Sequence, residues 1–346
     1  MNGADVATVS TSFLDAVPLD TPDEQLAEKV AEARRRLPSD EMIAHLRALL
    51  GFKGGPDVVL LGLPRTGTSW VFEHFHKSAN TAKYPFKEIN FLNMKTLFSD
   101  RYLASTLGRR NWRVYQRQFH AQHRDMIAAG MIDITIWALL VLIGRRNWHW
   151  YDTVMGSGPH QLGMDYTPSN FKMSAATAAL LRIRHPKARC AVILRHPLDR
   201  HQSHLARMSS PKTKTILPSE FDGDEFGGVS GYLFGERLRR LKRVLGHIEV
   251  FYFSDLKDDP LAFLRDFARR VGVSITADET AIAPINAMDW MPTVRYTKEA
   301  ISALLADMEH MNGIVRKDEL AKWKSDADRL YNAALKTGHA EIAGFP

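Results

Sequence analysis

The chain has 346 residues, of which 45% are hydrophobic, and its 46 basic and 39 acidic side chains give a formal net charge of +7. A chain of this size can bury a sizeable core, which favours a single α/β domain with additional helices. Its single cysteine, Cys190, excludes an internal disulfide and a cysteine-rich metal site. The arginine runs are short and scattered, unlike a nucleic-acid-binding surface, so the positive balance favours anionic substrates instead.

The N-terminal region predicts a helical extension, residues 1–50, on a core of residues 57–330. Residues 21–51 have the pattern of two helices that break near 37–40, where Ser39 or Asp40 can cap the second one. The first twenty residues lack a basic start followed by an apolar core, so we expect no secretory signal. Together with the single cysteine, this favours a cytoplasmic location.

The stretch VVLLGLPRTGTSWVFEHF, residues 58–75, predicts a strand, a tight turn and a helix. The apolar run ends at Gly62, and the helix begins after Gly67. A turn of this kind leaves backbone N–H groups at the helix N-terminus without intrahelical partners, and the helix dipole adds positive potential there. We therefore expect this turn to bind a phosphate or sulfate group.

The spacing of the two glycines matches the nucleotide-binding loop G-x-x-x-x-G-K-[ST], but Thr68 occupies the lysine position. In nucleotide triphosphatases that lysine reaches the β- and γ-phosphates, so its loss argues against hydrolysis of ATP or GTP. Arg65 is the cation that remains in the loop. With the hydroxyls of Thr66, Thr68 and Ser69, it suits an anion that needs charge stabilisation without a metal.

A second strand, residues 190–194, leads into Arg195 and then into a helix that begins near Pro197. If the two strands are neighbours in a parallel sheet, both turns leave from the same carboxyl edge, where open α/β sheets bind ligands. Arg195 and Ser203 are then placed to hold a second phosphate. Taken alone, the segment could also be a salt-bridged helix start, with Asp199 in the first turn.

Together the two segments resemble the donor-binding motifs of the sulfotransferases that use 3′-phosphoadenosine 5′-phosphosulfate (PAPS). The 5′-phosphosulfate loop of that family, P-[KR]-[ST]-G-T-[ST]-W, is matched from Pro64 to Trp70. The 3′-phosphate motif, R-[ND]-P-x-D-R-x-x-S, is matched by residues 195–203, except that His196 replaces the usual Asn or Asp. The resemblance implies a three-layer αβα fold of the P-loop NTPase type with a central, mostly parallel sheet. It also implies PAPS as the donor, 3′-phosphoadenosine 5′-phosphate (PAP) as the product, and no metal.

Two further stretches resemble the carbohydrate branch of that family, the heparan-type N- and O-sulfotransferases. Its K-E-x-x-F-F segment is similar to residues 87–92, and its T-P-x-Y segment is similar to residues 165–171. The resemblance gives Glu88 the role of general base, with Lys87 steadying the transferring group or orienting Glu88. A carboxylate suits this role when its surroundings bring its pKa toward neutrality. Without the resemblance, Lys87 and Glu88 would be expected to form a solvated charge pair.

A histidine is the rival general base, because histidine is the side chain whose pKa lies nearest to neutral pH. His201 and His204 share a helical face, but two ligands make a weak case for a metal site, and we expect both at the surface. The histidines in or beside the two motifs are His74, His76, His196, His201 and His204.

The remaining segments carry weaker signals. Residues 131–143 are apolar but contain an aspartate and are too short to span a bilayer, so they predict a buried helix. The aromatic residues of 100–150 belong to the core or wall an acceptor cleft. A third strand is expected over 247–253 and a helix over 260–271, and beyond them Arg295 is a further candidate contact to a phosphate of the donor.

The sequence thus predicts a PAPS-dependent sulfotransferase whose acceptor is a small molecule or a glycan that offers a hydroxyl or an amine. The alternatives are a P-loop nucleotide kinase or triphosphatase, and a non-catalytic protein of the same fold that binds phosphoanions. No nucleic acid partner and no transmembrane segment are expected.

Overall fold

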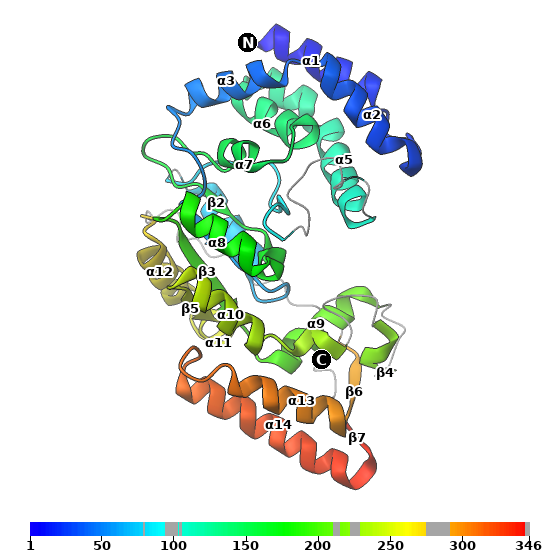
Figure 1. The fold of residues 1–346 in the computed structure, drawn as a ribbon, viewed down its shortest axis with the longest axis vertical. Helices are drawn as coiled ribbons and strands as arrows, with labels where there is room; N and C mark the ends of the chain where they lie inside the picture. Colours follow the sequence, from blue (N-terminus) through cyan, green and yellow to red (C-terminus); the bar gives the residue numbers. More distant parts are fainter. Residues whose placement is uncertain are drawn as a thin grey trace.

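The computed structural model describes residues 1–78, 80–93, 103, 106–209, 215–221, 229–274 and 291–342. Its elements are arranged in three tiers (Figure 1). The N-terminal helices and the helices of residues 106–154 occupy one end, a parallel sheet lies in the middle, and a second, smaller sheet with two long helices occupies the other end. The predicted motifs belong to the middle tier.

The central sheet consists of four parallel strands in the order β2-β1-β3-β5. In that order they span Met164–Asp165, Val58–Leu60, Arg189–Leu194 and Glu249–Tyr252. The second predicted strand is confirmed, and the third is shorter than the expected 247–253. Val59 of β1 pairs with Cys190 of β3, and Cys190 is buried there, as its apolar surroundings in the sequence predict.

Helices cover both faces of this sheet, which confirms the expected three-layer αβα arrangement. On one face, alternate strand residues such as Leu60 and Ile193 pack with helices α4 (Thr68–Lys77) and α12 (Pro260–Val271). The intervening residues, Val59 and Val192, belong to the larger core that also contains α8 (Ala175–Arg184) and α10 (Gly235–Leu245). This alternation follows from the two-residue period of a strand. The helix predicted over 260–271 is confirmed as α12, which follows the short α11 (Phe253–Asp258).

The N-terminal extension forms three helices, α1 (Gly3–Ala16), α2 (Asp23–Arg36) and α3 (Ser39–Leu49). The predicted break between the second and third is confirmed, but the predicted capping is wrong. Pro38 occupies the N-cap of α3, and no side chain caps the helix. The Pro38 carbonyl accepts the bond from the Met42 N–H, so Ser39 and Asp40 fall inside the first helical turn, where they cannot act as caps.

These helices pack on α5 (Thr106–Ala128) and α6 (Ile132–Ile143). Phe13 of α1 meets the ring of Trp112 of α5 edge-on at 6.3 Å. Helix α6 is buried from Thr135 to its end, which confirms the buried helix expected for 131–143. No helix within the described parts of the chain is both long and apolar enough to cross a membrane.

Most aromatic residues of this tier belong to its core. Trp112, Trp137, Trp150 and Tyr151, the last two in α7 (Trp148–Val154), are each less than 4% exposed. Three of their indole N–H groups bond to backbone carbonyls, as buried tryptophans require. Of the two interpretations that the sequence allowed, the structure supports core packing.

The C-terminal tier contains a three-stranded sheet in the order β4-β6-β7. These strands span Thr215–Ile216, Thr293–Thr297 and His339–Ile342, and β6 pairs antiparallel with β7. Helices α13 (Lys298–Glu309) and α14 (Lys317–Thr337) pack against each other beside it (Figure 1). Three short 3₁₀ helices, η2, η3 and η4, span Pro168–Lys172, Pro218–Phe221 and Val229–Tyr232.

Gly62 allows a close backbone approach that no other residue would permit. Its φ is +74°, and a Cβ built on it would lie 2.3 Å from the Pro168 Cα. Gly313 has a similar φ of +71° but nothing within 4 Å, so it is a matched control for backbone strain alone. We predict that Gly62→Ala lowers the free energy of unfolding by about 1–3 kcal/mol more than Gly313→Ala, because only the first also overpacks. Urea denaturation measures both losses, and equal losses would contradict the prediction.

Candidate anion-binding site at the sheet edge

The two predicted turns leave neighbouring strands at the same edge of the sheet. One turn follows β1 and the other follows β3, and these strands pair in parallel from Val58 with Arg189 onward. From β1 the chain continues to β2 on one side, and from β2 it crosses to β3 on the other side. The edge between β1 and β3 is therefore a topological switch point, where open α/β sheets bind ligands. This confirms the juxtaposition expected from the sequence.

The first turn holds its shape through its own backbone and side chains. Arg65 has a φ of +71°, a left-handed conformation that is rare for a residue with a Cβ. The Thr66 hydroxyl donates to the Leu63 carbonyl at 2.8 Å, so it braces the turn. Gly67, at the N-cap of α4, has a φ of +90° and makes no side-chain cap. The amide end of α4 and its dipole thus face the same edge as Arg65.

Arg65 and Arg195 join the first turn to the second. The Arg65 Nε donates to the Ser203 Oγ at 3.1 Å, and the Arg195 guanidinium donates to the Arg65 carbonyl at 3.3 Å. The Arg195 guanidinium also lies 4.6 Å from the centre of the Phe253 ring. Ser203 belongs to α9 (Pro197–Met208), which begins at Pro197 as predicted. Residues 138 positions apart in the chain therefore form one site.

The Lys87 ammonium lies close to two hydroxyl groups at the start of α4. Its Nζ lies 2.7 Å from the Ser69 Oγ and 3.4 Å from the Thr68 Oγ1. The Glu88 carboxylate lies 3.8 Å from the same ammonium, and its side chain is 44% exposed. Glu73 of α4 also interacts electrostatically with Lys87. In the segment predicted to carry the base, Lys87 is therefore the residue that contacts the turn. Glu88 lies next to Lys87, on its solvent-exposed side.

Several positively charged side chains at this edge are partly buried. Burial lowers the pKa of Arg65, Arg195 and Lys87, and for the last two the positive charge of Arg65 adds to the effect. The positive charge of Arg207 lowers the pKa of Arg65 further. An anion bound among these groups would relieve both the repulsion and the desolvation. Arg207 was missed in the sequence, although it lies on α9 one turn after Ser203 and the helical spacing of four residues points to it.

Other predicted residues lie elsewhere or serve the framework. The Trp70 ring is buried against His74, with ring centres 3.8 Å apart, and meets Phe263 edge-on. Arg295 lies in β6, and its guanidinium binds the Glu341 carboxylate of β7 at 2.7 Å. Arg295 is therefore placed with Glu341, and its contact with a phosphate stays a prediction.

The histidines near the motifs have distinct surroundings. His74 is buried and hydrogen-bonded to the Trp70 carbonyl at 2.8 Å. His196 is partly buried beside Trp323 of α14, and desolvation lowers its pKa. The surface position expected for His201 and His204 is wrong: both are buried, and His201 bonds to the Tyr296 hydroxyl at 2.9 Å. His201 contacts Tyr232 of η4 as well as Tyr296 of β6, so the polar face of α9 is buried at this position. Within the described ranges, no group of three or more His, Cys, Asp and Glu side chains is placed to hold a metal ion.

Comparison with solved structures finds a weak similarity. No family model matches the chain, and no curated protein matches it. Among solved structures, the chain is similar to a sulfotransferase from Alicyclobacillus acidocaldarius, with 18% sequence identity and a TM-score of 0.44. The alignment covers 78% of this chain and 98% of that one. At this level of similarity, the function has to be judged from the side chains of the site itself.

The charges of Arg65, Lys87, Arg195 and Arg207 predict that polyvalent anions stabilise the folded protein. Because a ligand that binds only the folded state stabilises it, pyrophosphate at ten times its Kd should add about 1.4 kcal/mol. We expect the melting temperature to rise with pyrophosphate in the unmodified protein and in Lys29→Gln, which removes an exposed charge on α2. Arg65→Gln should lose most of the rise. Equal rises in the two variants, measured by thermal denaturation, would place the anion elsewhere.

Proposed function

We propose that this protein is a sulfotransferase that moves the sulfuryl group of PAPS to a hydroxyl group of an acceptor. The observation that carries the proposal is the hydrogen bond between Arg65 and Ser203, which joins the two segments that resemble donor motifs. Two phosphate-binding turns at one sheet edge suit a donor with phosphates at both its 5′ and 3′ positions. A ligand with one phosphate would need only one of them.

In this proposal the donor lies along the edge between β1 and β3. The 64–70 turn and the amide end of α4 hold the 5′-phosphosulfate, with Arg65 as the nearest guanidinium. Arg195 and Ser203 hold the 3′-phosphate. The buried Arg200 of α9 donates to the Pro64 carbonyl of the first turn and to the Gly231 carbonyl of η4, so it ties α9 to both segments.

The proposed reaction is an in-line displacement at sulfur. The acceptor oxygen forms a bond to sulfur while the bond from sulfur to the bridging oxygen breaks, and the electron pair of that bond stays on the 5′-phosphate of PAP. The acceptor proton passes to the Glu88 carboxylate. Arg65, Lys87 and the α4 amides stabilise the negative charge that develops on the leaving phosphate, which is the largest contribution that such a site can make.

The contacts of Lys87 disfavour a P-loop nucleotide kinase or triphosphatase. In that class the hydroxyl after the loop lysine binds Mg²⁺, and Ser69 occupies this position here. The Ser69 Oγ lies 2.7 Å from the Lys87 ammonium, so a second cation on the same oxygen would be repelled. Thr68 occupies the position of the loop lysine, and the Lys87 ammonium reaches the loop from another segment. It contacts the same Ser69 hydroxyl that would bind Mg²⁺ in a triphosphatase.

Transfer of labelled sulfate tests the proposal directly. The protein is incubated with PAPS carrying radioactive sulfur and with a mixture of phenols, alcohols and sugars, and labelled products are separated from PAPS. Labelled products and equimolar PAP support the proposal. Binding of PAP without transfer to any acceptor would support the non-catalytic alternative, and hydrolysis of ATP that depends on Mg²⁺ would support the triphosphatase.

Removing the proposed base should separate chemistry from binding. We predict that Glu88→Gln lowers kcat by about 10²–10⁴-fold, because the amide cannot accept the acceptor proton. Its affinity for PAP, measured by calorimetry, should stay within about twofold of the unmodified protein, since Glu88 does not bind the nucleotide. Glu73→Gln is the matched control, because Glu73 also interacts with Lys87. Full activity of Glu88→Gln, or a larger loss in Glu73→Gln, would refute the assignment.

Arg195 should distinguish nucleotides by their 3′-phosphate. We expect Arg195→Ala to weaken PAP binding by about 10–100-fold, the loss expected for a charged hydrogen bond. Binding of adenosine 5′-phosphate, which lacks the 3′-phosphate, should weaken much less. Arg240→Ala, which removes an exposed arginine paired with Glu236 on α10, should change neither. If both nucleotides weakened equally in Arg195→Ala, Arg195 would not be the contact to the 3′-phosphate.

A further inference from the structure

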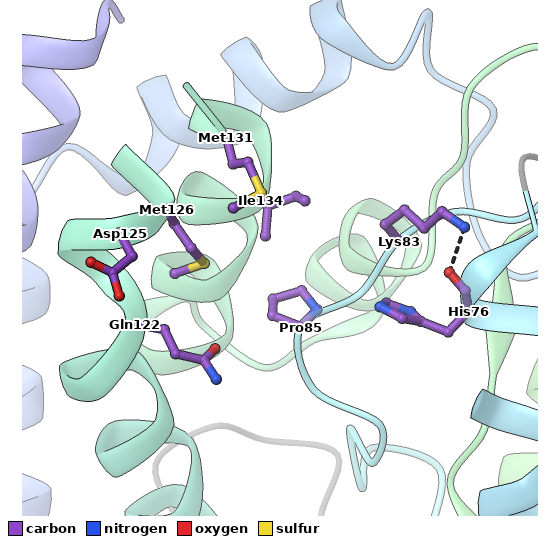
Figure 2. A pocket seen from close by; sticks show the side chains of 8 residues that line it. All are labelled: His76, Lys83, Pro85, Gln122, Asp125, Met126, Met131 and Ile134. Carbon is purple, nitrogen blue, oxygen red and sulfur yellow. Dashed lines mark hydrogen bonds between the residues drawn. The ribbon is translucent and has the colours of Figure 1, made fainter. Parts of the chain in front are cut away.

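An unassigned cavity of about 290 Å³ lies between α5, α6 and the segment that precedes Lys87. Figure 2 shows its lining side chains, which come from these elements and from His76 at the end of α4. Its apolar walls come from Pro85, Met126, Met131 and Ile134. Met126 is buried whereas Met131 is 38% exposed, so the cavity has an apolar floor and opens to the surface. Methionine side chains adapt their shape to different apolar ligands.

The polar side chains that line the cavity direct little positive charge into it. The Lys83 ammonium donates to the His76 and Ser78 carbonyls at the end of α4, and Figure 2 marks the first of these bonds. Burial, and then the positive charge of Lys83, lower the pKa of His76 and so disfavour its charged form. Asp125 places a carboxylate in the lining. This cavity is therefore unsuited to an anion, in contrast to the sheet edge.

The cavity is connected to the proposed reaction site by residues 83–88, which run back along α4. At one end Lys83 bonds to the last carbonyls of α4, and at the other end Lys87 bonds to Ser69 in its first turn. Ser69 and His76 are seven residues apart on the helix, which corresponds to about 10 Å along its axis. Pro85 lies between the two anchors and lines the cavity. Measured along the axis of α4, the end of the helix that lines the cavity thus lies roughly 10 Å from the turn.

We propose that this cavity binds the apolar arm of the acceptor, and that the acceptor is an uncharged hydroxyl compound about 10 Å long. Its hydroxyl lies at Glu88 and its far end lies among Pro85, Met131 and Ile134. The volume, at the small end of ligand pockets, fits one ring or a short chain. This inference rests on the proposed function, and it assigns a phenol or alcohol with an apolar body as the acceptor in place of an anionic glycan.

A set of three phenols tests the cavity without any sulfate transfer. 4-Phenylphenol carries the apolar arm, phenol lacks it, and 4′-hydroxybiphenyl-4-carboxylate adds a negative charge at its end. Binding of each is measured by calorimetry with and without PAP. We expect 4-phenylphenol to bind at least tenfold more tightly than the other two. Equal affinities for phenol and 4-phenylphenol would overturn the proposal.

A matched pair of variants locates the binding site. Ile134→Trp fills the cavity, whereas Ile183→Trp makes the same change on the surface of α8, where Ile183 is 74% exposed. We expect only Ile134→Trp to lose the preference for 4-phenylphenol, with PAP affinity unchanged in both. Met131→Glu is a second variant, which places a charge at an exposed wall and should have the same effect if Ile134→Trp fails to fold. A preference retained in the cavity variant that folds would overturn the proposal.

Kinetics separate this proposal from the proposed function. In the folded cavity variant the KM for 4-phenylphenol should rise at least tenfold, while the KM for PAPS stays the same. If sulfate is transferred to other acceptors but 4-phenylphenol does not bind, the inference about the cavity fails alone. If 4-phenylphenol binds with the expected pattern but no acceptor is ever sulfated, the proposed function fails, and with it the assignment of the cavity's ligand as an acceptor.

Discussion

The parallel pairing of β1 with β3 is the constraint on which the rest of the site depends. It brings the turns after the two strands to one edge, close enough for the Arg65 guanidinium to reach Ser203 and for Arg195 to reach the Arg65 carbonyl. The turn after β1 is also pressed against the Pro168 backbone at the exit of β2, which only a glycine at position 62 permits. Three strand exits therefore hold one candidate anion site, and a shift of any strand would separate its cations.

This arrangement has an energetic cost that a bound anion would offset. Arg65 is held in a left-handed conformation, which costs about 1–3 kcal/mol for a residue with a Cβ. Its charge is partly buried near those of Arg195 and Arg207, and burial lowers its pKa. Strain and uncompensated charge concentrated at one sheet edge are typical of a functional site and are rarely retained for stability alone. The cost is tolerated because β1, β3, α4 and α9 are all anchored in the buried core.

Local patterns predicted the strand, turn and helix units, because glycine positions and apolar runs report on the backbone directly. They predicted the partnership of Arg195 with the first turn only through the rule that parallel strands share an edge. The contact of Lys87 with Ser69 was not predictable in this way, since it depends on how an irregular segment folds back along α4. For His201 and His204, helical spacing indicated a shared face but not that this face is buried, with Tyr232 of η4 and Tyr296 of β6 against His201. Helix α1 lies within the helical extension expected for residues 1–50, but its bounds were not predicted, although Asn2 and Asp5 form a capping box.

The segment 83–88 gives the two sides of the proposed site their different chemistry. Both of its lysines bind α4, but at opposite ends: Lys83 neutralises the negative end of the helix dipole, and Lys87 adds charge to the positive end. The first contact removes a cation from the cavity beside Pro85, and the second concentrates one where a leaving phosphate would develop charge. One short segment thus links an apolar cavity to a cationic sheet edge. Because α4 fixes both ends of the segment, the helix sets the distance between the cavity and the edge. In the proposed reaction, this distance would make acceptor length a determinant of specificity.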